Sequence, residues 1–178
     1  TVGIITNIGV HHLDGCGSLE GYIKAKSEIV SGIEKGGTLI LNAEDLNTKQ
    51  VSLRNFKGKI IYFGVSKKAD FRASSIEFAN NGMNFSVNYL NKTYKAFIPG
   101  YGEHQVYNAL AAIAAVHEMG LDLDVAISRL ATFQNMARHL EFSKGIGGST
   151  IIDDTWTNNP TSVKAALEVL DSIGADKN

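Results

Sequence analysis

Short apolar runs alternate with a longer amphipathic segment at the start of the chain, and this alternation constrains the fold more than any other feature. Val2–Thr6, Thr38–Leu41 and Lys59–Phe63 each have the length and composition of a buried strand, and Leu19–Ile33 has the spacing of a helix. Buried strands joined through helices form parallel sheets with helices on their faces. We therefore expect an α/β fold with a mostly parallel sheet flanked by helices.

The pattern changes between Phe71 and Pro99, where strand-like segments follow one another without a helix. Asn80-Asn81-Gly82 and Asn91-Lys92 interrupt this stretch with residues that are typical of hairpin turns. We therefore predict a small antiparallel β meander here.

Helices return after the meander, and a second strand-turn-helix unit follows them. The predicted helices are Gln105–Met119 and Leu123–Ala131, and the second unit consists of strand Ser149–Ile152 and helix Pro160–Ile173. The segment before Arg138 has the composition of a connection, so we place a domain boundary near this residue.

Composition argues against several classes of function. The formal net charge is −1, which gives no indication of binding to nucleic acid or to an anionic membrane. No run approaches the roughly 20 apolar residues that a membrane span needs. Cys16 is the single cysteine of the sequence, so an internal disulfide is excluded and a reducing, cytoplasmic compartment is expected.

Polar side chains gather in the loop after the first strand, which is where α/β proteins place their ligands. The loop contains Asn7, His11, His12 and Asp14. Adjacent histidines suit either surface hydrogen bonding or metal ligation, and the asparagine and aspartate are equally explained as turn formers. The spacing leaves these interpretations open.

Lys26 lies in the predicted helix Leu19–Ile33, where helical spacing aligns it with Tyr22 and Val30 on one stripe. One interpretation is a lysine that lies along the apolar face and extends its ammonium group to the edge. The other is a desolvated lysine with a lowered pKa, able to act as a nucleophile or to be carbamylated by carbon dioxide. A carbamate would convert this cation into an anionic oxygen ligand for magnesium.

A series of ordered blocks extends over nearly the whole chain and resembles the central domain of the Mur ligases. These blocks are Thr6-Asn7-Ile8-Gly9-x-x-His12-Leu13, Gly17-Ser18-x-Glu20, Ala25-Lys26-x-Glu28-Ile29, Leu41-Asn42-x-x-Asp45, Gly102-x-His104-x-x-x-Asn108-Ala109-Leu110-Ala111-Ala112, Arg138, and Asp153-Asp154-x-x-x-Asn158-Asn159-Pro160-x-Ser162-x-x-Ala165-Ala166-Leu167. The last block is most similar to the branch that adds D-alanyl-D-alanine to UDP-N-acetylmuramoyl-tripeptide.

The resemblance implies a role for individual residues of this sequence. His12 matches a histidine that helps to hold Mg²⁺, and Lys26 matches the carbamylated lysine of the family, so both are candidate catalytic and metal-binding residues. Asn108 matches the asparagine that reads the adenine of ATP, Arg138 an arginine near the ATP phosphates, and Asp154 an acid that binds ribose. From the sequence alone, helix capping, a solvated hinge and a turn would explain the last three equally.

The family's reaction is ATP-dependent amide formation, in which a carboxylate attacks the γ-phosphate and an amine then displaces phosphate from the acyl phosphate. The resemblance therefore implies ATP and Mg²⁺ as cofactors, and a UDP-MurNAc-peptide and an amino acid or dipeptide as substrates. It also implies two domains. Residues 1–137 would be part of the central ATP-binding domain, and residues 138–178 would begin a Rossmann-like C-terminal domain.

The sequence holds no Gly-x-x-Gly-Lys-Thr/Ser loop of the kind that cradles ATP phosphates, and in the family this loop lies upstream of the strand at Val2. We therefore expect this chain to be an inactive portion of a ligase, with a sheet edge whose exposure favours self-association. The alternatives are a non-catalytic nucleotide-binding or interaction module of the same fold, and a ligase of the folylpolyglutamate or polyglutamate type.

Overall fold

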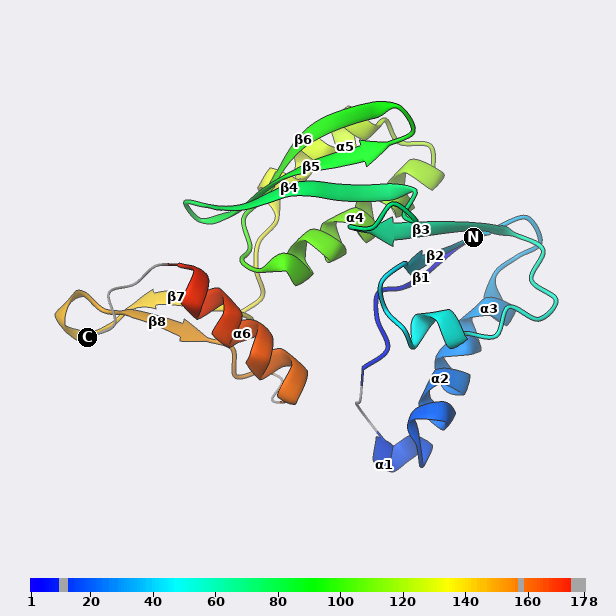
Figure 1. The fold of residues 1–178 in the computed structure, drawn as a ribbon, viewed down its shortest axis with the longest axis horizontal. Coiled ribbons are helices and arrows are strands. Elements are labelled where there is room, and N and C mark those ends of the chain that lie inside the picture. The colour runs from blue at the N-terminus through cyan, green and yellow to red at the C-terminus, as the bar shows by residue number, and fades with distance from the viewer. Residues whose placement is uncertain (10–12, 157–158, 174–178) are drawn as a thin grey trace.

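The computed structural model describes residues 1–9, 13–156 and 159–173, and the side chains of residues 13 and 14 are outside this description. One six-stranded sheet runs through the larger part of the molecule in the order β1-β2-β3-β4-β5-β6 (Figure 1). Its strands are β1 (Val2–Ile5), β2 (Thr38–Asn42), β3 (Lys59–Gly64), β4 (Phe71–Ala79), β5 (Gly82–Tyr89) and β6 (Lys92–Ile98).

The pairing in this sheet changes from parallel to antiparallel at β4, and β5 runs opposite to the other five strands. β1 through β4 pair in parallel, whereas β4, β5 and β6 pair antiparallel. The predicted α/β fold with a mostly parallel sheet and an antiparallel meander is therefore confirmed, and the meander extends the parallel sheet instead of forming a separate one. The turns fall at Asn80-Asn81 and Leu90-Asn91, next to the predicted signals.

Helices cover both faces of the sheet. α2 (Leu19–Ser27) and α3 (Ile29–Gly32) lie on one face, and α4 (Glu103–Glu118) and α5 (Leu123–Arg129) lie on the other. The short helix α1 (Leu13–Cys16) contacts α2, and 3₁₀ turns occur at Thr48–Gln50, Leu130–Thr132 and Ile146–Gly148. β2 has every residue buried, because its side chains alternate between two cores. Leu39 and Leu41 pack with Ile23 of α2, while Ile40 joins the core beneath α4.

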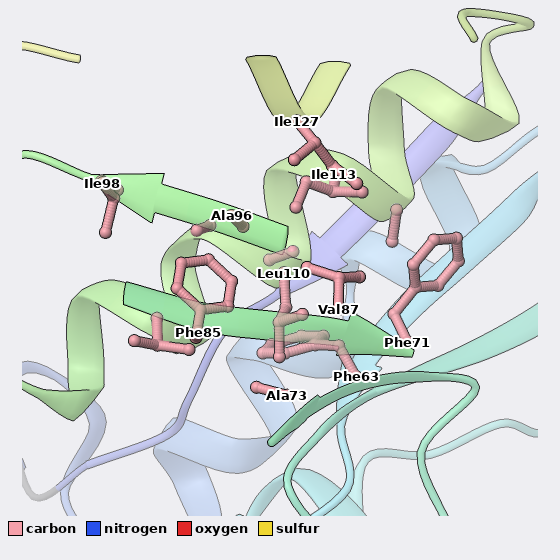
Figure 2. Close-up of a cluster of buried hydrophobic side chains, with 14 of the residues drawn as sticks. Phe63, Phe71, Ala73, Phe85, Val87, Ala96, Ile98, Leu110, Ile113 and Ile127 are labelled. Atoms are coloured by element: carbon pink, nitrogen blue, oxygen red, sulfur yellow. The ribbon is translucent and has the colours of Figure 1, made fainter. Parts of the chain in front are cut away.

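The larger core lies between the sheet and helices α4 and α5. Figure 2 shows Leu110 of α4 beside Val87, and Ile113 of α4 next to Ile127 of α5. This packing fixes α4 across the sheet, and α4 carries the candidate adenine-reading residue Asn108. The rigid core therefore determines where the first turns of α4 lie.

The C-terminal part forms a second, smaller unit beside the sheet (Figure 1). It consists of a two-stranded antiparallel sheet, β7 (Glu141–Lys144) with β8 (Thr150–Asp153), and helix α6 (Pro160–Ser172). Asn159 caps α6 through a capping box with Ser162, and Pro160 follows as the first helical residue. The two-stranded sheet begins at Glu141, close to the domain boundary that we predict near Arg138. The boundary itself stays a prediction.

Two predictions about local structure are wrong. The segment Leu19–Ile33 is not one helix, because the chain leaves the helical ladder at Glu28 and forms α2 and α3. Lys26 is exposed and Ile23 is the buried residue of α2, so Lys26 does not lie on the buried face. Strand β7 was not predicted, and the predicted strand Ser149–Ile152 begins and ends one residue later.

Candidate nucleotide site

A pocket of about 360 Å³ lies where the first turns of α4 face the C-terminal unit. Its lining comes from the loop after β1, from α4, from the segments around β7 and β8, and from the start of α6: Asn7, His104, Gln105, Asn108, His139, Leu140, Asp154, Asn159, Thr161, Ser162 and Ala165. The pocket thus brings together Asn108 and Asp154, two of the residues that the sequence singled out.

α4 presents its side chains to this pocket because of the way the helix begins. Gly102 precedes the helix with φ 95° and ψ 152°, a conformation that is essentially restricted to glycine. A Cβ atom there would lie 2.6 Å from Cε1 of His104 and 3.1 Å from Cγ2 of Val169. The glycine therefore permits close contact between α4 and α6.

His104 is the titratable group at this contact. Burial lowers the pKa of His104, and the carboxylates of Asp154 and Glu168 partly offset that effect. A neutral imidazole is consequently favoured between α4 and α6. Val169, which is 1% exposed, is the buried residue of α6 and packs against the same glycine.

Asp154 is tied to the chain that crosses from one unit to the other. Its Oδ1 accepts a hydrogen bond from the backbone N–H of Leu140 at 3.1 Å. On the α4 side, Nε2 of Gln105 donates to Oδ1 of Asn135 at 3.3 Å, and Nδ2 of Asn135 donates to the carbonyl of His139 at 2.6 Å. This network holds the connecting segment against the pocket.

Arg138 is not among the residues that line the pocket, although its neighbour His139 is. Its guanidinium carbon lies 5.1 Å from the centre of the Trp156 ring. Its backbone carbonyl accepts a hydrogen bond from the backbone N–H of Trp156 at 3.2 Å. Its φ of 61° places it in the left-handed region. The side chain thus packs on an exposed indole beside the site.

The predicted magnesium side of the site is only partly described. His12 and His11 lie outside the described residues. Lys26 is exposed, and its Nζ lies 5.3 Å from the centre of the Tyr22 ring. Among the described residues, no group of three or more His, Cys, Asp or Glu side chains is arranged to hold a metal ion.

Two further findings concern the wider molecule. Cys16 is a half-buried free cysteine. Among the described residues, no helix is both long and apolar enough to span a bilayer.

The sequence profile of the Mur ligase middle domain matches residues 1–116. The UDP-N-acetylmuramoyl-tripeptide–D-alanyl-D-alanine ligase of Bacillus subtilis is 31% identical over 170 residues, which cover 96% of this chain and 36% of the relative. The UDP-N-acetylmuramate–L-alanine ligase of Alkaliphilus metalliredigens is 36% identical over 172 residues, which cover 94% of this chain and 36% of the relative. The chain thus spans just over a third of the length of these relatives.

Solved structures agree with these relationships. The crystal structure of MurF from Acinetobacter baumannii superposes with a TM-score of 0.87 at 32% identity, covering 96% of this chain and 37% of that one. The MurF ligase of Thermotoga maritima in complex with ADP has a TM-score of 0.82 at 19% identity, covering 96% and 39%, which shows the shared fold. The profile match over more than half of the chain establishes the relationship: this chain belongs to the Mur ligase family.

Proposed function

We propose that this chain is the nucleotide-binding part of an ATP-dependent ligase that forms an amide bond on a peptidoglycan precursor. The observation that carries the proposal is that Asn108 and Asp154 line the same pocket. These residues come from separate units of the fold, and the resemblance assigned them to the adenine and the ribose of ATP. Their convergence supports those roles.

The chemistry of the lining favours the nucleoside half of ATP. The described lining is rich in amide side chains and contains no lysine or arginine. Amides donate and accept hydrogen bonds, which suits the edge of a purine, and a carboxylate accepts hydrogen bonds from ribose hydroxyls. Crowded phosphate oxygens, in contrast, need cations or helix N-termini. We propose that Arg138 serves the phosphates, moving from its position over Trp156 to do so.

In the proposed reaction, a substrate carboxylate is activated as an acyl phosphate at the expense of ATP, and an incoming amine displaces phosphate. The residues of this chain bind and orient the nucleotide for that transfer. Mg²⁺ is proposed on the resemblance alone, with His12 and a carbamate on Lys26 as its ligands. The described side chains assemble no metal site, so we derive no step through the ion.

The substrates are proposed at the level of class. By their names, the relatives join D-alanyl-D-alanine to a UDP-N-acetylmuramoyl-tripeptide or L-alanine to UDP-N-acetylmuramate. We propose a UDP-MurNAc or UDP-MurNAc-peptide acceptor and an amino acid or dipeptide donor, in the cytoplasm. A folylpolyglutamate-type ligase is a weaker alternative, since the Lactobacillus casei structure with that fold is only 16% identical.

The test is a titration of this chain with ADP, followed by amide chemical shifts in NMR spectra. We expect shifts centred on the residues that surround the pocket, and a loss of affinity in Asn108→Ala and Asp154→Asn. Asn84→Ala is a matched control, because Asn84 is exposed on β5 and away from the pocket. Shifts confined to another surface would contradict the proposal.

A second experiment tests catalysis. We expect no ADP release from ATP by the 178-residue chain in the presence of a muramoyl-peptide acceptor and an amine donor. Turnover by this chain alone would contradict its assignment as an incomplete part of a ligase. ADP binding by a longer gene product that lacks ligase activity would favour the non-catalytic module instead.

A further inference from the structure

The block Leu41-Asn42-x-x-Asp45 has no role in the function proposed above, yet two of its side chains form hydrogen bonds with the backbone of the loop that follows β1. Nδ2 of Asn42 donates to the carbonyl of Thr6 at 3.0 Å. Oδ2 of Asp45 accepts from the backbone N–H of Ile8 at 2.7 Å. The last residue of β2 and the loop after it therefore form hydrogen bonds with main-chain groups on both sides of Asn7.

A third side chain completes this arrangement. Nδ2 of Asn47 donates to the carbonyl of Ile8 at 2.7 Å. The hydroxyl of Thr48, itself 1% exposed, donates to the same carboxylate oxygen of Asp45 that receives the Ile8 N–H. We call these four residues, Asn42, Asp45, Asn47 and Thr48, the loop clamp.

The clamp acts on a short segment with few other restraints. Ile8 is 2% exposed and anchors the segment in the core with β2, whereas Asn7 is exposed and reaches the pocket. Side-chain hydrogen bonds to backbone groups can replace the sheet ladder where a strand ends, so the segment keeps one conformation beyond β1. The carboxylate makes the charge-assisted bond, which is the strongest kind in this set.

Asn7 lines the pocket, and within the described part of the chain its side-chain amide makes one hydrogen bond. Its Oδ1 accepts from the hydroxyl of Thr6 at 3.3 Å, and among the described residues its Nδ2 has no hydrogen-bond partner. An amide with an unused donor, on a fixed backbone, at the wall of a pocket is suited to reading a ligand.

We propose that Asn7 is a further nucleotide-contacting residue and that Asp45 is the positioning residue that holds it in place through Ile8. The ligand group is on the base or ribose of the nucleotide, because the described lining around Asn7 contains no lysine or arginine to hold phosphates. This inference rests on the proposed nucleotide-binding function and adds a residue of the first strand's loop to the site.

The experiment measures ADP affinity and amide exchange in the 178-residue chain and its variants. Asn7→Ala removes the proposed contact and should weaken ADP binding about 2- to 10-fold, the range for one hydrogen bond. Asn84→Ala controls for loss of a surface asparagine. Asp45→Asn should accelerate exchange of the Ile8 amide and weaken ADP binding by a similar factor.

A double-mutant cycle separates positioning from general destabilisation. If Asp45 acts through Asn7, then Asp45→Asn in the Asn7→Ala background costs no further affinity. Asp122→Asn is the control, because Oδ1 of Asp122 likewise accepts hydrogen bonds from backbone N–H groups, those of Asp124 and Val125 at the start of α5. It should lower stability without altering ADP affinity.

The possible outcomes distinguish a failure of the further inference from a failure of the proposed function. ADP binding that is unaffected by Asn7→Ala, or additive losses in the cycle, would overturn the further inference and leave the proposed function standing. The absence of any ADP-induced shift near Asn108 in the wild-type chain would overturn the proposed function, and the ligand role of Asn7 with it. Unchanged Ile8 exchange in Asp45→Asn would refute the clamp in either case.

Discussion

The glycine before α4 offers a sharp test of how the two units of this chain meet. Gly102 has φ 95° and ψ 152°, and its Cα faces both His104 and Val169. Gly102→Ala imposes two separate costs. The first is the backbone cost of holding a residue with a Cβ in this region, about 1–3 kcal/mol.

The second cost is steric. The new Cβ would lie 2.6 Å from Cε1 and 2.7 Å from Nδ1 of the His104 ring, and 3.1 Å from Cγ2 of Val169. Real contacts are longer, so the ring or α6 must move. Inserting a carbon into a packed site in this way costs about 1–3 kcal/mol. We therefore expect Gly102→Ala to lower the free energy of unfolding by roughly 2–6 kcal/mol in total.

Gly120→Ala separates the two costs. Gly120 ends the same helix with φ 90°, and a Cβ there would meet nothing within 4 Å. It therefore reports the cost of a Cβ at positive φ with little steric addition. Urea denaturation of the two variants should show Gly102→Ala as the more destabilised by about 1–3 kcal/mol. Equal losses, or a larger loss in Gly120→Ala, would refute the tight contact between α4 and α6.

Three further changes probe the same region and the magnesium side. Val169→Ala should cost roughly 2 kcal/mol and reduce amide protection in α6, because it removes methyl groups from a buried side chain, whereas Val163→Ala at a 48% exposed position should have little effect. Because the pKa of His104 is lowered in the folded state, the unfolded chain binds a proton there more readily than the folded chain does. The free energy of unfolding should therefore be unaffected by protonation of this residue above pH 6.5 and should decrease as the pH falls below that value. Urea denaturation at several pH values should show that the free energy of unfolding of His104→Gln depends less on pH. In an intact ligase, Lys26→Ala should abolish ADP-forming activity and regain part of it with added short carboxylates, and full activity without them would contradict the carbamate.

Local chemistry was enough to predict much of the fold. The turn residues at Asn80-Asn81-Gly82 and the Asn159-Pro160 pair each specify a backbone conformation through their own side chains, and the structure has the expected hairpin and helix start there. The apolar runs at β2 and β3 were equally clear, because Leu39–Leu41 is buried on both faces of the sheet and Ile61 and Phe63 are buried in the core.

Predictions that depended on long-range geometry were less successful. The stripe through Tyr22, Lys26 and Val30 assumed one continuous helix, and the break at Glu28 changes which residues share a face. Strand β7 was missed because it has no buried residue, so its sequence carries no alternation that periodicity could detect. Asn7 looked like a turn former because its exposure to the pocket is set by side chains of residues 42–48, which no local pattern connects to it.

The described lining of the pocket suits the roles that we propose for Asn108 and Asp154 better than it suits a phosphate site. Amide and carboxylate groups converge from two units on a space suited to a nucleoside, and their positions follow from the core under α4 and from the capping of α6. Phosphates demand concentrated positive charge, yet the described lining supplies none and Arg138 lies over an indole instead. If the pocket binds the nucleoside half by hydrogen bonds, as we propose, then its affinity depends on the placement of these groups more than on charge. This makes the clamp on the loop after β1 and the glycine before α4 the features on which nucleotide affinity should depend most.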